Sequence, residues 1–269
     1  DILEFSKIEV GKIEMDNSSF NLKDCIEDLV DVLSNQVYSK KLELPVYIDS
    51  NIPHLVTGDQ SKLTQILVNL IGNAIKFTPS GEVTVEVKSQ SRIDDNIQVY
   101  FEIRDTGVGI SKSKLKSIFA PFKQADVSDT RKYGGSGLGL TISKELVEIL
   151  GGELCVESEE CVGTKFFFTI PIGVSDLKNA ATATSTLNEN TSVKLLIANK
   201  TIRKNLQKRI ESWNSTVQVI TDLENISWED ESKDLKHLII DHYYLSDQTL
   251  EKLKHMSRDV HVIVLAPLA

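Results

Sequence analysis

Apolar residues recur at two spacings along the first two thirds of the chain. Helical spacing predicts helices over residues 1–15, 24–39, 60–77 and 140–150. Asp59 is expected to cap the third of these helices. Short apolar or alternating segments predict strands over 42–48, 83–87, 97–103, 153–157 and 164–170. Because these helices and strands mix without alternating strictly, we expect a two-layer α/β sandwich, with the helices on one face of a mixed sheet.

After residue 192 the predicted strands and helices alternate more regularly. Strands are predicted over 193–198, 217–220, 238–241 and 260–265, with helices that carry Ile202–Trp213 and Leu250–Met256. Regular alternation of strands and helices favours a parallel sheet. The Ala/Thr/Ser/Asn-rich stretch before it has no apolar period and is expected to be a linker. The chain is therefore predicted to consist of a first helix (1–15), a mixed α/β domain (16–173), a linker (174–191) and an alternating strand–helix domain (192–269).

The composition is that of an ordinary globular protein. The 269 residues include 30 Lys and Arg against 39 Asp and Glu, a net charge of −9. An acidic chain argues against nucleic acid as a ligand, since affinity for the phosphate backbone rests on Lys and Arg. No apolar run reaches the ~18 residues that span a bilayer. Cys25, Cys155 and Cys161 are odd in number and lie in apolar patterns, so buried thiols in a reducing compartment are expected, with a disulfide as the alternative. We expect a cytoplasmic fragment without membrane contact, even if its parent protein is membrane-anchored.

The helix over 60–77 carries a polar stripe opposite its core-facing side. Four polar residues fall within about 80° of one another on a helical wheel: Gln65, Asn69, Asn73 and Lys76. A solvated helix face is one explanation of the stripe. A binding site is the other, because an Asn amide oxygen is a neutral hard ligand for Mg²⁺ and a lysine pairs with phosphate oxygens.

The segment DTGVG at 105–109 directly follows a predicted strand. Asp105 keeps the register of the apolar strand residues, so its carboxylate is expected to face the core side. A carboxylate there is costly unless a donor satisfies it. An adenine amino group is such a donor, and glycines allow close approach of a base. An ordinary D-x-G turn is the alternative.

A glycine-rich segment, GGSGLG at 134–139, opens the helix predicted over 140–150. Free backbone N–H groups at a helix amino end favour phosphate. The spacing fits neither the dinucleotide fingerprint nor the P-loop. The order of the three segments is more specific than any one of them.

Taken together, these segments resemble the catalytic ATP-binding domain of sensor histidine kinases, in the Bergerat-fold (GHKL) superfamily. QILVNLIGNAIKFT is similar to the N box of that family, DTGVGI to its G1 box, FAPF to its F box and GGSGLGL to its G2 box. The segment GTKFFFTIPI resembles the closing strand, and DILEFSKIEVGKIE the end of the second dimerisation helix of hybrid kinases. The resemblance covers about residues 1–172.

The resemblance implies a role for each matching residue. Asn73 would bind Mg²⁺ and, with Lys76, act in catalysis. Asn69 would assist at the triphosphate, and Asp105 would hold the adenine amino group. The other residues implied at the ATP site belong to the adenine pocket, to the lid that carries Arg131 and Lys132, or to the glycine-rich turn. They are Gly107, Gly109, Ile110, Phe119, Phe122, Arg131, Lys132, Gly135, Ser136, Gly137, Leu138, Gly139, Leu140 and Thr164. Solvated loop charges are the alternative for the two lid cations.

The implied reaction is phosphoryl transfer from ATP, with Mg²⁺, to a histidine. The superfamily's ATPases carry a general-base Glu where this chain has Asn69, which cannot act as a base. None of the five histidines lies in an acceptor-like helix. The acceptor is therefore expected on the dimerisation domain of the same, homodimeric kinase, with a downstream receiver or phosphotransfer protein completing the phosphorelay. An ATP-sensing pseudokinase or scaffold without turnover is the alternative, and a GHKL ATPase is disfavoured.

The segment after 192 resembles a flavodoxin-like receiver domain that is incomplete. Asp241 matches the phosphoacceptor position, at the end of the third predicted strand. Ala198 and Asn199 stand where an acidic pair would hold Mg²⁺, and Ala266 or Pro267 where a hydroxyl residue is expected. Without the acidic metal site, transfer to Asp241 loses its main electrostatic support. We expect a degenerate receiver in which Asp241 is a vestigial acceptor.

Overall fold

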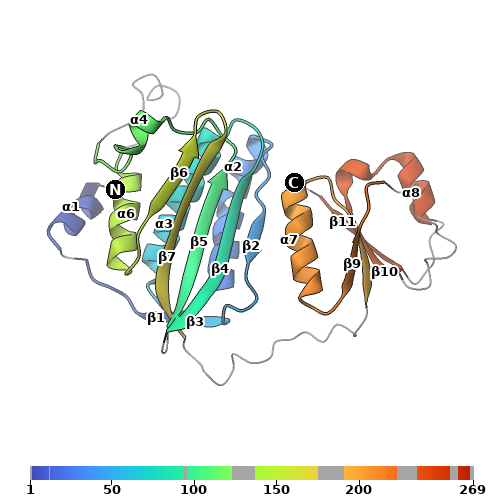
Figure 1. Ribbon diagram of the computed structural model, residues 1–269, viewed down its shortest axis with the longest axis horizontal. Helices are drawn as coiled ribbons and strands as arrows, with labels where there is room; N and C mark the ends of the chain where they lie inside the picture. The colour runs from blue at the N-terminus through green and yellow to red at the C-terminus, as the bar shows by residue number, and fades with distance from the viewer. Residues whose placement is uncertain are drawn as a thin grey trace. The chain divides into compact units, whose positions relative to one another are not determined.

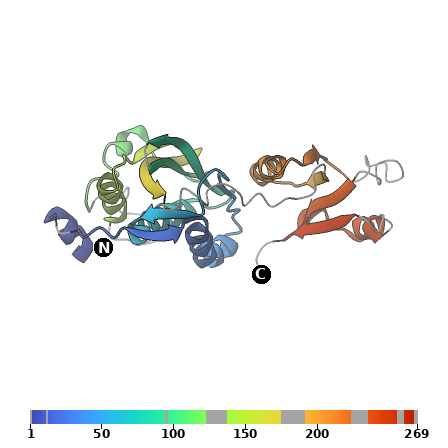
Figure 2. The same cartoon turned by 90° about the horizontal axis from the view of Figure 1, so that it is seen from below.

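The chain forms two compact units, Asp1–Ala180 and Ala181–Ala269. We describe them from a computed structural model (Figures 1 and 2). The residues that the structure describes are 2–11, 13–93, 96–122, 137–174, 191–222, 235–254 and 260–266.

The first unit is a seven-stranded sheet with helices on one face (Figure 1). Its elements in chain order are α1 (Ile2–Glu9), β1 (Ser18–Asn21), α2 (Leu22–Ser39), β2 (Val46–Ile48), β3 (Leu55–Gly58), α3 (Gln60–Phe77), β4 (Val83–Ile93), β5 (Asn96–Asp105), α4 (Lys112–Leu115), α6 (Gly139–Ile149), β6 (Cys155–Glu159) and β7 (Gly163–Val174). The strand order is β1-β3-β7-β5-β4-β2, with β6 on β7. The β2–β4 pair is parallel and the other pairs are antiparallel, so the predicted mixed α/β sandwich is confirmed.

The core of this unit lies between the sheet and α2, α3 and α6. Alternate residues of β5 are buried, which leaves Phe101 against its register partner Phe168 on β7, with ring centroids 4.9 Å apart. The buried residues of α3 include Leu63, Ile66 and Leu70. Close packing of these side chains against the sheet fixes the helix and leaves its polar stripe outward.

Polar side chains set the amino ends of the two long helices. The Asp59 carboxylate accepts a hydrogen bond from the Lys62 backbone N–H at 2.9 Å, so the predicted cap of α3 is confirmed. Asp59 also accepts from the Asp16 backbone N–H, which ties the segment before β1 to α3. Asn21 caps α2, which begins two residues before the predicted start at Asp24.

The prediction of a helix over residues 1–15 was wrong in its extent. The helix α1 ends at Glu9, and Gly11 adopts a φ of +66°, a left-handed conformation that ends helices. The predicted strand over 42–48 is confirmed only for Val46–Ile48. The four-residue strands β1 and β3 were missed, because segments this short show no periodicity.

The prediction of three buried thiols was correct for Cys25 alone. Its sulfur lies 3.3 Å from the Thr64 hydroxyl. Cys155 is half-buried, and Cys161 is exposed in the turn between β6 and β7 with a φ of +63°. All three cysteines are free. Val162, the apolar neighbour of Cys161, belongs to the same turn rather than to a strand, which explains the error.

The second unit is a four-stranded parallel sheet, as predicted. Its elements are β8 (Ser192–Leu196), α7 (Lys200–Glu211), β9 (Thr216–Val219), β10 (Leu235–Asp241), a 3₁₀ turn (His242–Tyr244), α8 (Asp247–Lys254) and β11 (His261–Leu265). The strand order is β11-β10-β8-β9. Trp213 lies beyond the end of α7, and Met256 lies outside the described residues.

Across the described part of both units, none of the helices combines the length and the hydropathy that crossing a bilayer requires.

Candidate nucleotide site

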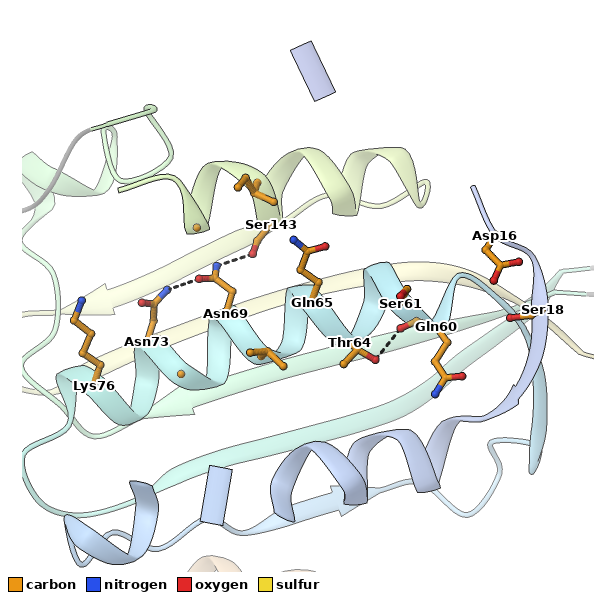
Figure 3. Close-up of a pocket in the computed structure, with 14 residues that line it drawn as sticks. Asp16, Ser18, Gln60, Ser61, Thr64, Gln65, Asn69, Asn73, Lys76 and Ser143 are labelled. Carbon is orange, nitrogen blue, oxygen red and sulfur yellow. Dashed lines mark hydrogen bonds between the residues drawn. The ribbon is translucent and has the colours of Figure 1, made fainter. Parts of the chain in front are cut away.

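The polar stripe of α3 borders a pocket between α3 and α6 (Figure 3). The pocket has a volume of about 800 Å³. Its lining residues come from α3, from α6 and from the segment that enters β1: Asp16, Ser18, Gln60, Ser61, Thr64, Gln65, Val68, Asn69, Gly72, Asn73, Lys76, Gly139, Ile142 and Ser143. All four residues of the predicted stripe therefore lie on one pocket wall.

The two asparagines of the stripe are hydrogen-bonded to each other. Asn69 Nδ2 donates to the Ser143 hydroxyl at 2.7 Å, and Asn73 Nδ2 donates to Asn69 Oδ1 at 3.3 Å (Figure 3). Asn73 Oδ1 accepts no hydrogen bond from the described residues. An amide oxygen of this kind is a ligand for a hard cation.

The carboxyl end of α3 is held by a lysine that the sequence did not reveal as a site residue. Lys40, the residue after α2, donates from Nζ to the main-chain oxygens of Ile75 and Lys76, each at 2.8 Å. An ammonium group at this position donates to the last main-chain carbonyls of a helix and is attracted by the partial negative charge at the carboxyl end. Lys40 thus fixes the helical turn that carries Lys76.

Asp105 ends β5 and faces the core side, as its register predicts. It is 7% exposed, and its Oδ1 accepts from the backbone N–H groups of Gly107 at 2.8 Å and Thr164 at 3.2 Å. Its Oδ2 accepts no hydrogen bond from the described residues. Burial raises the pKa of Asp105, because two backbone donors only partly offset the loss of water. The open oxygen is suited to an external donor.

The glycines of the 105–109 segment are required by contacts with the protein backbone. A Cβ at Gly107 would lie 2.3 Å from the Phe77 carbonyl oxygen, and one at Gly109 would lie 2.0 Å from the Glu159 carbonyl oxygen. Gly109 also has a φ of +67°. The expected reason for these glycines was approach of a base, whereas the structure supplies a second reason in the close packing of the loop.

A serine that sequence analysis missed supports the surroundings of Asp105. Ser158 Oγ lies 2.9 Å from the Thr164 hydroxyl, donates to Gly163 O and accepts from the Ile110 N–H at 2.8 Å. Thr164 in turn contacts Asp105. No local pattern marks Ser158, because its partners are brought to it by the β6–β7 hairpin.

The other predicted residues divide between the described and the undescribed parts of the chain. Arg131, Lys132, Gly135 and Ser136 lie outside the described residues. Gly137 has a φ of +69°, Leu138 is fully buried, and Gly139 begins α6 without a capping side chain. Leu140 and Phe119 pack on the core, and Phe122 is exposed beside the Phe5 ring, with centroids 6.0 Å apart.

In the second unit, Asp241 ends β10 as predicted, and it is buried. Its Oδ1 lies 2.9 Å from His242 Nδ1, and its Oδ2 accepts from the Ala198 N–H at 3.4 Å. The Asn199 side chain caps α7 by accepting from the N–H groups of Thr201 and Ile202. Its oxygen is therefore already engaged in the helix cap.

The described residues contain no group of three or more His, Cys, Asp or Glu side chains that could hold a metal ion. A cation at Asn73 would need further ligands, and a polyphosphate supplies them. The fold defines the class of this unit, a mixed α/β sandwich domain, with a polar pocket between α3 and α6.

Comparisons with known proteins name the family. Residues 58–174 match the family described as histidine kinase-, DNA gyrase B-, and HSP90-like ATPase. The match to that family covers this part of the chain, and the chain is similar in sequence to hybrid histidine kinases. It is 42% identical over 174 residues to hybrid signal transduction histidine kinase B of Dictyostelium discoideum. The aligned region covers 65% of this chain and 9% of that protein.

Two further relatives extend the comparison. Histidine protein kinase 1 of Candida albicans is 37% identical over 238 residues, 87% of this chain and 9% of the relative, so the similarity reaches the second unit. The structure of full-length ShkA in complex with AMPPNP aligns with a TM-score of 0.76 at 25% identity, covering 98% of this chain and 52% of that one. The chain spans only about a tenth of the length of these two curated kinases.

Proposed function

We propose that this chain is the ATP-binding catalytic core of a hybrid sensor histidine kinase. It would transfer the γ-phosphoryl group of ATP to a histidine on a dimerisation helix that lies outside this chain, within a two-component phosphorelay. The observation that carries the proposal is the presence of both a buried, half-satisfied Asp105 and an amide-lined wall on α3 in a domain that matches the histidine kinase ATPase family.

Adenine fits the environment of Asp105. One carboxylate oxygen is engaged by Gly107 and Thr164, and the other is available to the exocyclic amino group. A buried carboxylate oxygen without a hydrogen-bond donor carries an uncompensated desolvation cost. A ligand that supplies the donor removes this cost, and the free energy recovered favours its binding. Ile110, which packs on the core beside this loop, would add apolar contact to the base.

The triphosphate fits the wall of α3. Asn73 would hold Mg²⁺ through Oδ1, and the cation would neutralise charge on the phosphates. The Lys76 ammonium would contact phosphate oxygens and stabilise charge in the transition state. The uncapped amino end of α6 at Gly139 adds backbone N–H groups that favour an anion. By the family resemblance, Arg131 and Lys132 would belong to the ATP lid, and Gly135 and Ser136 to the glycine-rich turn that binds phosphate.

Transfer to a protein nucleophile is favoured over hydrolysis. A general base for water must accept a proton within hydrogen-bond reach of the attacking oxygen. Asn69 occupies the position one turn before Asn73, and a neutral amide does not accept that proton. An imidazole nitrogen would instead attack the γ-phosphorus in line, forming the N–P bond as the bond to the β,γ-bridging oxygen breaks and ADP leaves.

The acceptor imidazole would come from the dimerisation domain of the same protein. His54, the only histidine of the first unit, is exposed in the loop before β3. We interpret α1 as the end of the second dimerisation helix, which would make the parent kinase a homodimer. A receiver or phosphotransfer protein would then take the phosphoryl group onward.

We propose that the second unit is a degenerate receiver-like module. Its strand order is that of the first four strands of a flavodoxin-like sheet. The engagement of Asn199 in a helix cap and of Asp241 with Ala198 and His242 supports a spacer or interaction role rather than phosphorylation. The sequence similarity to the Candida kinase across this unit is consistent with a place in hybrid kinases.

The decisive experiment supplies a separate dimerisation domain that bears the histidine, with γ-labelled ATP and Mg²⁺. We expect acid-labile label on that domain, abolished by Asn73→Ala and by Asp105→Ala. Asn35→Ala, which changes an exposed residue on α2, is the matched control and should leave labelling unchanged. ATP binding without label on any histidine domain would instead support the scaffold alternative.

A further inference from the structure

A line of polar side chains connects α6 to the proposed metal-binding amide on α3. Ser143 lies one turn into α6, and its hydroxyl accepts from Asn69 Nδ2 at 2.7 Å. Asn69 Oδ1 then accepts from Asn73 Nδ2 at 3.3 Å (Figure 3). Ser143 is 74 residues from Asn69 in the chain, so the line exists only in the folded domain.

The first two members of this line have little freedom to move. Ser143 is 1% exposed. Asn69 lies against the backbone of α6, since a Cβ on Gly139 would come within 2.3 Å of Asn69 Oδ1. Gly139 and Ser143 are one helical turn apart and face the same side of α6. Between them they confine the Asn69 amide to a single orientation.

The orientation of Asn69 decides that of Asn73. An Asn amide presents an oxygen on one side and an NH₂ group on the other, and only the oxygen binds a cation. The Asn69 oxygen points toward the following turn of α3, where Asn73 lies, and Asn73 donates from its NH₂ group to that oxygen. The Asn73 oxygen is then directed away from Asn69.

We propose that Ser143 is a positioning residue for Mg²⁺, acting through Asn69 to hold the oxygen of Asn73 in the binding orientation. The inference rests on the proposed function and changes the role expected for Asn69. Each polar end of the Asn69 amide makes a hydrogen bond within the protein, and through these two bonds Asn69 orients a ligand residue.

Loss of the Ser143 hydroxyl leaves Asn69 Nδ2 without its partner and allows the Asn69 amide to turn over. Asn73 then loses its acceptor and samples orientations that present NH₂ to the cation. One neutral hydrogen bond corresponds to a change of about fivefold in an equilibrium. The adenine contacts at Asp105 are unaffected, so the effect should depend on Mg²⁺.

The test measures binding of a fluorescent ATP analogue by wild-type protein and by Ser143→Ala, in EDTA and across a Mg²⁺ titration. We expect Ser143→Ala to raise the Mg²⁺ concentration that gives half-maximal tightening by about fivefold, with unchanged affinity in EDTA. Ser143→Thr, which retains the hydroxyl, should lie closer to wild type. Val147→Ala truncates another buried side chain of α6 without touching the line, and should leave the Mg²⁺ dependence unchanged.

Two results would overturn the inference alone. One is wild-type Mg²⁺ dependence in Ser143→Ala, and the other is an equal loss of affinity with and without Mg²⁺, which would mean a purely structural role. Wild-type protein that bound no nucleotide at any Mg²⁺ concentration would overturn the proposed function and this inference together.

Discussion

Lys40 Nζ lies 2.8 Å from the main-chain oxygen of Lys76, so the residue that follows α2 caps the end of α3. The same ammonium group reaches the Ile75 oxygen at 2.8 Å and the Thr78 oxygen at 3.5 Å. A single side chain therefore joins the carboxyl ends of two helices beside the proposed triphosphate wall. Stability of the domain and placement of Lys76 are coupled at this point.

Replacement of this lysine should weaken both properties. We expect Lys40→Met to lower the free energy of unfolding of the first unit by about 2 kcal/mol, since hydrogen bonds to a charged donor are lost and carbonyl groups are left unpaired. ATP affinity should fall as the last turn of α3 frays. Urea unfolding followed by far-UV circular dichroism, with ATP titration, measures both. Lys41→Met, at the exposed neighbouring position, is the control and should change neither.

The ionised Asp105 carboxylate should favour ATP binding and lower the folding stability of the first unit. Because burial raises its pKa in the folded state, the ionised carboxylate costs stability at neutral pH, and that cost disappears as the pH falls below the unfolded value of 3.8. We expect Asp105→Asn, which keeps an acceptor for Gly107 and Thr164, to raise the melting temperature at neutral pH. ATP affinity should drop at least tenfold, about one charge-assisted hydrogen bond.

The pH dependence of that comparison checks its cause. The advantage of Asp105→Asn over wild type should shrink as the pH is lowered, because the wild-type carboxylate becomes neutral first in the folded state. An Asn variant less stable than wild type at neutral pH would contradict the burial argument.

Two glycines should respond to alanine in opposite directions. Gly109→Ala places a Cβ 2.0 Å from the Glu159 oxygen at a φ of +67°, so we expect a loss of more than about 2 kcal/mol. Gly72 lies inside α3 with no atom within 4 Å of an added Cβ, and Gly72→Ala should stabilise the unit by about 0.5–1 kcal/mol. Thermal unfolding of the pair compares them directly. Equal effects would show that the loop gives way around the new methyl group.

The second unit should lose stability in mild acid. His237 on β10 is the register partner of His261 on β11, with ring centroids 5.3 Å apart. Burial, and then the neighbouring His261, lower the pKa of His237 below 6.5. Well above pH 6.5 His237 is neutral in both the folded and the unfolded state. As the pH falls from 6.5 toward the lower folded pKa, the unfolded state binds its proton first, so stability is lost over that interval.

Tryptophan fluorescence isolates this effect, because both tryptophans of the chain follow residue 181. We expect the urea midpoint of the fluorescence transition to fall between about pH 7.5 and pH 5.5. His237→Phe should remove much of that fall. A midpoint that stayed constant in wild-type protein would falsify the assignment.

The sequence by itself determined the parts of this protein that depend on local spacing. The cap at Asp59, the polar stripe of α3 and the core-facing register of Asp105 follow from patterns within one element, and the structure confirms each. The parallel sheet of the second unit also followed from its rhythm. Local errors arose where a pattern was too short, as in β1 and β3, or was ended by Gly11.

Only the tertiary structure decided which residues support the site. Lys40, Ser143 and Ser158 carry no local signal, because each acts on a segment far away in the chain. Their contribution depends on the packing of α2 and α6 against α3, and on the β6–β7 hairpin, which bring donors and acceptors within 3 Å. Hydrophobic spacing specifies that a helix packs, whereas the partner of each buried polar atom is specified only once the elements have met.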